Sequence, residues 1–392
     1  MTTVESSAMA DSDSAKSGPN AEELVLTGSA IIIRRQLPTD LETWRVPLHA
    51  DASEHTEAIW KMLSPFFAER GYTLWPHGHN YMSTASVDDV SANGYMYTVS
   101  PYRSESSDKS WDSMQGILSY ESRNALTRAA RASDGRDVVL KVLAIGEEGK
   151  EHVDILDMLA RGAYSLITAN HTLPLLDLIV LDDITFGVFP KVGYSCSEVY
   201  GSWAKSSVRD VLDMIAQCLE ALVFLHYSKV AHRDVFKDNF VIQWVPETLR
   251  VDRDVPASRP RVYMINFELA VGFPVDGPPE EHVCVGPPPL GSHPDGTKRP
   301  AAPETLSDKP YDPFKLDVWQ LGTTFSDFKS TIPAIDKVLA SMTDPDPATR
   351  PTAYEAMKAL LDAVGAVPPA SLLIEPRLSL EPRRLGPESA TP

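Results

Sequence analysis

The stretch from residue 232 to residue 239 carries side chains whose types and spacing could transfer a proton beside a bound metal ion. It reads His232-Arg233-Asp234-Val235-Phe236-Lys237-Asp238-Asn239. In the pattern H-R-D-x-x-x-x-N, the carboxylate of Asp234 can accept a hydroxyl proton and the side-chain oxygen of Asn239 can hold a metal. Four fixed residue types at fixed offsets arise by chance in a chain this long about once in a thousand sequences. The stretch therefore predicts a catalytic loop.

A predicted helix precedes this loop and would position it. Apolar residues recur at helical spacing before His226, namely Val208, Val211, Leu212, Ile215, Leu219, Leu222 and Leu225. A stripe of this kind is typical of a helix that is buried along one face. We interpret the stripe as core, not as a ligand site.

Lys141 is a second candidate for chemistry because it lies in the middle of an apolar run, residues 138–143. The run is β-branched and aliphatic, which predicts a buried strand. Burying an ammonium group is unfavourable unless it meets negative charge. Nucleotide phosphates would supply that charge, so Lys141 is a candidate for phosphate binding.

Three more motifs follow the loop in order along the chain. They are Ala302-Pro303-Glu304, Asp317-Val318-Trp319-Gln320-Leu321-Gly322 and Asp344-Pro345-Asp346-Pro347-Ala348-Thr349-Arg350-Pro351. Taken with the loop and the lysine strand, they make residues 116–363 resemble the eukaryotic protein kinase family. The resemblance implies an α+β, bilobal protein kinase-like fold with a small β-rich N-lobe and a mostly helical C-lobe.

The resemblance also implies roles for individual residues. Lys141 is similar to the strand lysine that binds the α- and β-phosphates of ATP, Asp234 matches the catalytic base, and Asn239 matches a ligand of Mg²⁺. The implied function is ATP-dependent phosphoryl transfer to the hydroxyl of a protein substrate, with ATP and Mg²⁺ as cofactors.

Three other residues resemble structural positions of the family. Glu304 is similar to a glutamate that pairs with an arginine late in the large lobe, which is Arg350 in this sequence. Asp317 resembles the aspartate that braces the catalytic loop from the following helix. Removing one partner of such a buried ion pair is strongly destabilising.

The sequence departs from the family at its second metal ligand. A predicted strand at residues 262–265 is followed by Asn266-Phe267-Glu268, where the family has Asp-Phe-Gly. The resemblance makes Asn266 the other candidate metal ligand, but its neutral carbonyl holds Mg²⁺ less strongly than a carboxylate does. Metal charge stabilises the transition state by several kcal/mol, roughly, and we therefore expect weakened transfer.

Three further departures concern the surroundings of the nucleotide. Residues 117–134 contain no glycine where the family has a glycine-rich phosphate loop before the lysine strand. On the helix expected at residues 149–159, the family pattern places His152 at the partner position of Lys141, with Glu151 one residue away. Phe236 replaces the lysine of Ser/Thr-specific kinases and Lys237 follows it, so the type of substrate hydroxyl stays open.

The composition bounds the class of protein. The net charge is −18, from 36 basic and 54 acidic residues, which disfavours nucleic acid as a partner. The cysteines Cys196, Cys218 and Cys284 are odd in number and widely spaced, which is not a disulfide framework. No apolar run approaches membrane-spanning length. We expect an intracellular protein, cytoplasmic or nuclear, that does not bind membranes.

The sequence suggests five segments. They are a disordered N-terminal segment at 1–45, an extension at 46–115, an N-lobe at 116–192, a C-lobe at 193–365 and a disordered tail at 366–392. In the extension, the apolar stripe between Thr56 and Gly71 predicts a helix that packs on the small lobe or, alternatively, binds a partner. His77 and His79 could bind a metal, but without nearby cysteine or carboxylate partners a surface loop is favoured.

Three functions are compatible with these motifs. The first is an active, weakened protein kinase, and the second is a pseudokinase that binds nucleotide or acts as a scaffold. The third is a small-molecule kinase of the related fold, which Arg233, the Ala302-Pro303-Glu304 motif and the Asp317 motif disfavour. Lys141, Asp234 and Asn239 support the first function over the second. Asn266 and the missing glycines oppose it.

Overall fold

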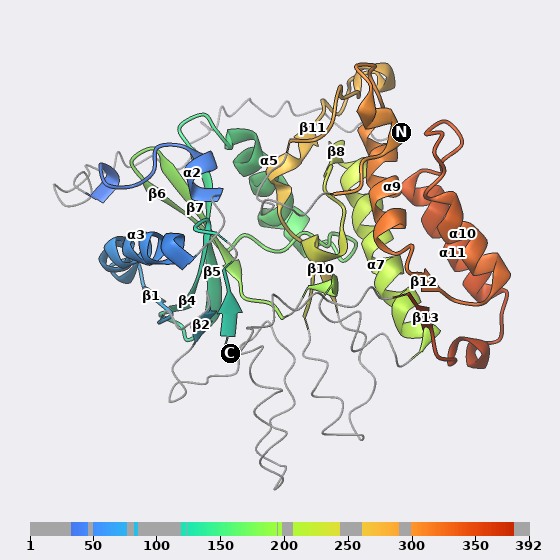
Figure 1. Cartoon of the computed structure of the whole chain (residues 1–392), viewed down its shortest axis with the longest axis horizontal. Coiled ribbons are helices and arrows are strands. Elements are labelled where there is room, and N and C mark those ends of the chain that lie inside the picture. The colour runs from blue at the N-terminus through green and yellow to red at the C-terminus, as the bar shows by residue number, and fades with distance from the viewer. Residues whose placement is uncertain are drawn as a thin grey trace, which may run out of the picture.

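The chain folds into an α+β structure in which an antiparallel sheet lies beside a group of helices (Figure 1). The computed structural model describes residues 33–45, 50–76, 82–84, 119–122, 124–193, 195–197, 207–243, 261–289 and 299–379. His77, His79 and the end of the tail from residue 380 lie outside the described residues.

The sheet has five antiparallel strands in the order β1-β4-β5-β7-β6. Their bounds are β1 (Tyr72–Leu74), β4 (Thr127–Ala132), β5 (Asp137–Ile145), β6 (Asp177–Leu181) and β7 (Ile184–Pro190). The sheet therefore begins at Tyr72, well before the boundary at 116 that the sequence suggests. The link between its first two neighbouring strands runs from Trp75 to Leu126, and within it β2 (Met82–Thr84) pairs with β3 (Ser119–Glu121).

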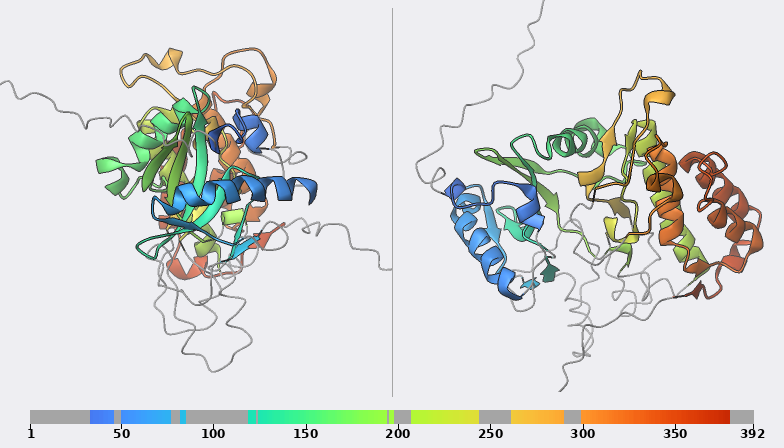
Figure 2. Two further views of the ribbon diagram at one scale, coloured as in Figure 1. Left: turned by 90° about the vertical axis from the view of Figure 1, so that its left-hand side faces the viewer. Right: turned by 45° about the horizontal axis from the view of Figure 1, so that its top comes forward.

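Up to the irregularity after Val142, strand β5 sends alternate side chains to opposite faces, as a period of two requires. Val138, Leu140 and Val142 join a core that includes α3 (Ala50–Ala68). Leu143 belongs instead to the core shared with α5 (Lys150–Ala160) and the helices beyond it. Lys141 lies between Leu140 and Val142 in this alternation and therefore on the opposite, α5 face. Figure 2 shows α3 and α5 on opposite sides of the sheet.

Helix α3 covers one face of the sheet with the predicted apolar stripe. The stripe residues are all buried, namely Ile59, Trp60, Leu63, Phe66 and Phe67. The ring of Phe67 meets Phe186 of β7 edge to face, with centroids 5.1 Å apart, and Trp60 Nε1 donates to Ala125 O at 3.0 Å. Packing on the sheet, the favoured of the two interpretations, is confirmed.

Residues 33–45, predicted to be disordered, are ordered against this core. Leu37, Leu41 and Trp44 are buried, the last two in α2 (Leu41–Arg45), and Trp44 meets Trp60 edge to face at 6.2 Å. Arg34 pairs with Asp183 in the turn between β6 and β7. The predicted disorder is wrong for these residues because their few large apolar side chains complete the core that α3 begins.

The helical part is built around α7 (Val208–Tyr227), which begins at the cap residue Ser207 and is buried along the predicted stripe. The helices α9 (Pro313–Thr324) and α11 (Ala353–Gly365) pack beside it, and α10 (Pro333–Ser341) packs on these two (Figure 1). Residues 366–379, expected in the disordered tail, include η8 (Pro369–Leu372) and β13 (Arg377–Leu378), which pairs with β12 (Phe328–Lys329).

Short elements connect the sheet to the helices. The strand pairs are β8 (Val230–Ala231) with β11 (Val271–Gly272) and β9 (Phe240–Ile242) with β10 (Val262–Met264). The single turns are η3 (Gly162–Leu166), η4 (Lys237–Asn239), η5 (Phe267–Leu269), η6 (Pro279–Glu281) and η7 (Pro303–Leu306). Within the described part of the chain, none of the helices is both long and apolar enough to cross a membrane.

Candidate functional site

The loop between β8 and β9 carries Asp234, and a buried carboxylate on α9 fixes its start. Asp317 is fully buried and accepts the backbone N–H of Arg233 at 2.7 Å and that of His232 at 2.8 Å. His226, at the end of α7, lies 2.9 Å from the same carboxylate through Nε2. The predicted brace is confirmed, because the carboxylate satisfies donors that the tight loop cannot pair internally.

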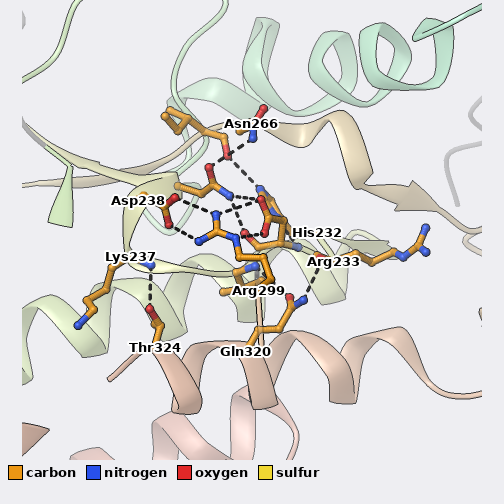
Figure 3. A network of polar contacts seen from close by, with 12 residues as sticks. His232, Arg233, Lys237, Asp238, Asn266, Arg299, Gln320 and Thr324 are labelled. Carbon is orange, nitrogen blue, oxygen red and sulfur yellow. Dashed lines mark hydrogen bonds and ion pairs between the residues drawn. The ribbon is translucent and has the colours of Figure 1, made fainter. Parts of the chain in front are cut away.

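Gln320, one turn further along α9, holds the other side of the loop (Figure 3). Its Oε1 accepts from Val235 N at 2.9 Å and its Nε2 donates to Arg233 O at 2.9 Å. Sequence reasoning missed this residue, although the three-residue spacing from Asp317 places both on one helix face.

His232 joins the loop to the segment after β10. Its Nδ1 accepts from Asp234 N at 3.3 Å and its Nε2 donates to Ile265 O at 3.0 Å, which fixes a neutral tautomer. Burial lowers the pKa of His232, in keeping with that neutral form. The ring packs edge to face on Phe267 at 4.9 Å. The loop and residues 265–267 therefore form one packed unit.

The predicted residues Asp234, Asn239, Asn266 and Lys141 are linked by successive hydrogen bonds. Asn239 Nδ2 donates to Asp234 O at 2.8 Å and also to the carboxylate. Asn266 Nδ2 donates to Asn239 Oδ1 at 3.4 Å, and Lys141 Nζ donates to Asn266 Oδ1 at 2.7 Å. Asn266 has a left-handed backbone, φ 68°, which asparagine tolerates better than most residues. The structure thus brings all four candidates to one site.

The carboxylate that acts on Lys141 comes from Glu268 and not from α5. Burial lowers the pKa of Lys141, and Glu268, whose side chain is 5% exposed, acts in the opposite direction. Glu268 also pairs with Arg45 of α2 at 3.5 Å. In the sequence Glu268 stands where the family has a glycine, and sequence reasoning missed the role of its charge.

On α5, His152 is the residue that the charge of Lys141 influences, and Glu151 makes a separate hydrogen bond. His152 is buried beside Lys141, and burial, with Lys141 adding to it, lowers the pKa of His152 to about 3. Glu151 instead accepts from Gly272 N at 3.2 Å, away from the lysine. The helix therefore presents a neutral imidazole where an acidic partner of Lys141 was sought.

Arg299 binds the candidate base and was not foreseen from the sequence. Its Nε lies 3.1 Å from Asp234 Oδ1, and Nη1 and Nη2 each lie 2.8 Å from an oxygen of Asp238 (Figure 3). The guanidinium carbon stacks 4.3 Å from the centre of the Phe236 ring. Lys237 points elsewhere and pairs with Asp327 at 2.9 Å. Arg299 is thus the cation that meets Asp234.

A buried ion pair anchors the segment that follows Arg299. Glu304 meets Arg350 through two contacts of 2.6 and 3.1 Å, and the Arg350 side chain is fully buried. Arg350 also donates to Lys315 O and Asp344 O. The pair predicted from the sequence is confirmed, and it holds η7 against α9.

The oxygen atoms of the site do not fit a divalent cation as they are arranged. The Oδ1 of Asn266 accepts a hydrogen bond from Lys141 Nζ, and the Oδ1 of Asn239 accepts one from Asn266 Nδ2. The carboxylates of Asp234 and Asp238 bind Arg299. Among the described residues, no group of three or more His, Cys, Asp or Glu side chains is placed to hold a metal. Mg²⁺ requires open oxygen ligands, and Asn239 and Asn266 do not provide them in this geometry.

Comparison with known proteins adds no relative from which a role could be transferred. No protein-family profile matches the sequence, and a search of curated proteins finds no match.

Proposed function

We propose that this chain is a bilobal, protein kinase-like domain that binds ATP and transfers its phosphoryl group slowly to a protein hydroxyl. The sheet with α5 would be the small lobe, and the helices around α7 would be the large lobe. The antiparallel order β1-β4-β5-β7-β6, with Lys141 on the face covered by α5, supports this assignment. The chain has separate elements on either side of the site, as such a fold requires.

The observation that carries the proposal is the continuous contact from Lys141 through Asn266 and Asn239 to Asp234. A phosphate-binding cation and a proton-accepting carboxylate must face one reaction centre, although they lie far apart in the sequence. The brace from Asp317 gives the loop a fixed geometry, because two of its backbone donors are held by one buried carboxylate. Positioning of this kind supplies most of the catalysis in phosphoryl transfer.

Each residue would have a distinct task in the proposed reaction. Lys141 would bind the nucleotide phosphates, and the negative charge of Glu268 opposes the lowering of its pKa by burial. Asp234 would accept the proton of the attacking hydroxyl, and Asn239 would orient the Asp234 carboxylate through Nδ2.

A second candidate function is a nucleotide-binding or scaffolding module that transfers nothing. The contact of Arg299 with Asp234 favours this alternative, because a carboxylate that binds a guanidinium is a weaker proton acceptor. Asn266 favours this alternative as well, because its Oδ1 accepts a hydrogen bond from Lys141 and is not an open ligand for Mg²⁺.

The two functions separate in an assay of phosphate transfer from labelled ATP to the chain itself and to a mixture of protein substrates. Asp234→Asn removes the proton acceptor and should lower the wild-type rate by about 10²-fold or more. Asp362→Asn, on the exposed surface of α11, is the matched control and should leave the rate unchanged. An Asp234→Asn rate equal to wild type would refute transfer at this site. ATP binding without transfer in the wild type would establish the module.

A further inference from the structure

We infer that this site binds nucleoside triphosphate without a divalent metal, with Arg299 supplying positive charge beside the catalytic loop. The inference rests on the proposed nucleotide site and concerns how that site meets the charge of the phosphates. It assigns a binding role to Arg299, a residue outside the motifs of the sequence.

The possible metal ligands of the site are already engaged by protein groups. A divalent cation would have to break the bond between Lys141 and Asn266 and turn the amide of Asn266 away from Asn239. It would also have to displace Arg299 from Asp234 and Asp238. Each of these contacts is between oppositely charged or polar groups in a partly buried site, so the metal would have to replace several favourable interactions at once.

Arg299 is held in place by several contacts. Its side chain is 24% exposed, and the guanidinium both forks onto Asp238 and stacks on Phe236. The chain continues directly into η7, which the buried pair of Glu304 with Arg350 fixes to the helical part. Arginine stays protonated at every physiological pH, so its charge is permanent. Arg299 is therefore a preorganised cation and not a mobile surface side chain.

The charges around the site also bear on how it would bind a nucleotide. The chain carries a net charge of −18, so an anionic nucleotide needs cations close at hand. Lys141 supplies one at the sheet and Arg299 one at the loop, on either side of the Asn239–Asn266 contact. Without Arg299, the carboxylates of Asp234 and Asp238 would repel the phosphates. Arg299 thus offsets one of the two carboxylate charges of the loop and lowers the repulsion that Mg²⁺ otherwise screens.

The test is isothermal titration calorimetry of the full chain with ATP, once in EDTA and once in millimolar Mg²⁺. We expect wild-type dissociation constants that differ by less than about threefold between the two buffers. Arg299→Gln should weaken binding in EDTA by about tenfold, because the loop then carries uncompensated carboxylates. Mg²⁺ should restore most of that loss, since Asp234 and Asp238 become open ligands. The affinity of Arg299→Lys for ATP in EDTA should fall between those of wild type and Arg299→Gln. The control Arg161→Gln removes an exposed arginine of the same charge and should bind like wild type.

The outcomes separate this inference from the proposed function. Wild-type binding that Mg²⁺ strengthens tenfold or more would overturn the inference and leave the nucleotide site standing. Arg299→Gln binding in EDTA that equals wild type would overturn the role of Arg299. Absence of ATP binding in both buffers would overturn the nucleotide site and the inference together. The wild-type comparison requires no variant, so it holds even if Arg299→Gln folds poorly.

Discussion

Replacing Asp317 by asparagine should strongly destabilise the chain, because the change keeps the shape of the side chain but removes its charge and one acceptor. The carboxylate is fully buried and accepts from Arg233 N on one oxygen and from His232 N on the other, which also meets His226. An asparagine must place its NH₂ group against at least one of these donors.

The magnitude follows from these contacts. The less damaging orientation turns the new NH₂ toward Arg233 N, which loses a hydrogen bond to a charged acceptor worth about 1.5–3 kcal/mol. The backbone N–H of Arg233 is then left without an acceptor, and the bonds from His232 and His226 weaken to those of a neutral acceptor. Together these losses should lower the free energy of unfolding by about 3–5 kcal/mol.

Equilibrium unfolding in urea, followed by circular dichroism and by tryptophan fluorescence, measures this loss. Asp362→Asn on α11 removes an exposed carboxylate that pairs with Lys358 and should leave the midpoint unchanged. If Asp317→Asn unfolds within about 1 kcal/mol of wild type, the carboxylate does not brace the loop.

Two more predictions concern buried charges. The pKa of His152 is lowered from 6.5 to about 3 in the folded chain. Between these two pH values, the imidazole is therefore protonated only in the unfolded chain. The stabilisation is full above about pH 6.5 and is lost as pH falls toward 3, amounting to about 2 kcal/mol between pH 7 and pH 5. Between pH 7 and pH 5, the free energy of unfolding of His152→Gln, measured in urea, should therefore fall by about 2 kcal/mol less than that of wild type. An equal fall in both would contradict the buried, neutral state of His152. Glu304→Gln leaves the guanidinium of Arg350 buried without its carboxylate and should reduce stability by about 3–5 kcal/mol. The double variant with Arg350→Met should recover part of that loss, whereas strictly additive losses would contradict coupling between the two residues.

Much of the core was predictable because its periodicity is local. The stripe on α3 and the stripe on α7 each fit one helix face, and the continuous apolar run at residues 138–143 fits one buried strand. Tyr72–Leu74 was not recognised as a strand because three residues are too few to show a period. A long connection separates this strand from β4, its partner in the sheet, so no hairpin signal marks the pair.

The sequence predicted those residues of the candidate site that belong to motifs of fixed residue type and spacing. Asp234, Asn239 and Asp317 could be placed because they belong to motifs with fixed offsets. Arg299 could not be found in this way, since its contact with Asp234 spans 65 positions and depends on how η7 is anchored. Glu268 was missed for a related reason, because only the folded chain brings it between Lys141 and Arg45.

The central claim is that Lys141 belongs to a nucleotide site, and a thermal-shift titration with ATP tests it most directly. A ligand that binds only the folded chain stabilises it by about 2.7 kcal/mol at a hundredfold excess over its dissociation constant. The unfolding midpoint of the wild type should therefore rise with ATP, and that of Lys141→Met should rise little or not at all. Lys150→Met, an exposed lysine at the start of α5, should respond like wild type. Equal shifts in wild type and Lys141→Met, or no shift of the wild type at millimolar ATP, would contradict the claim.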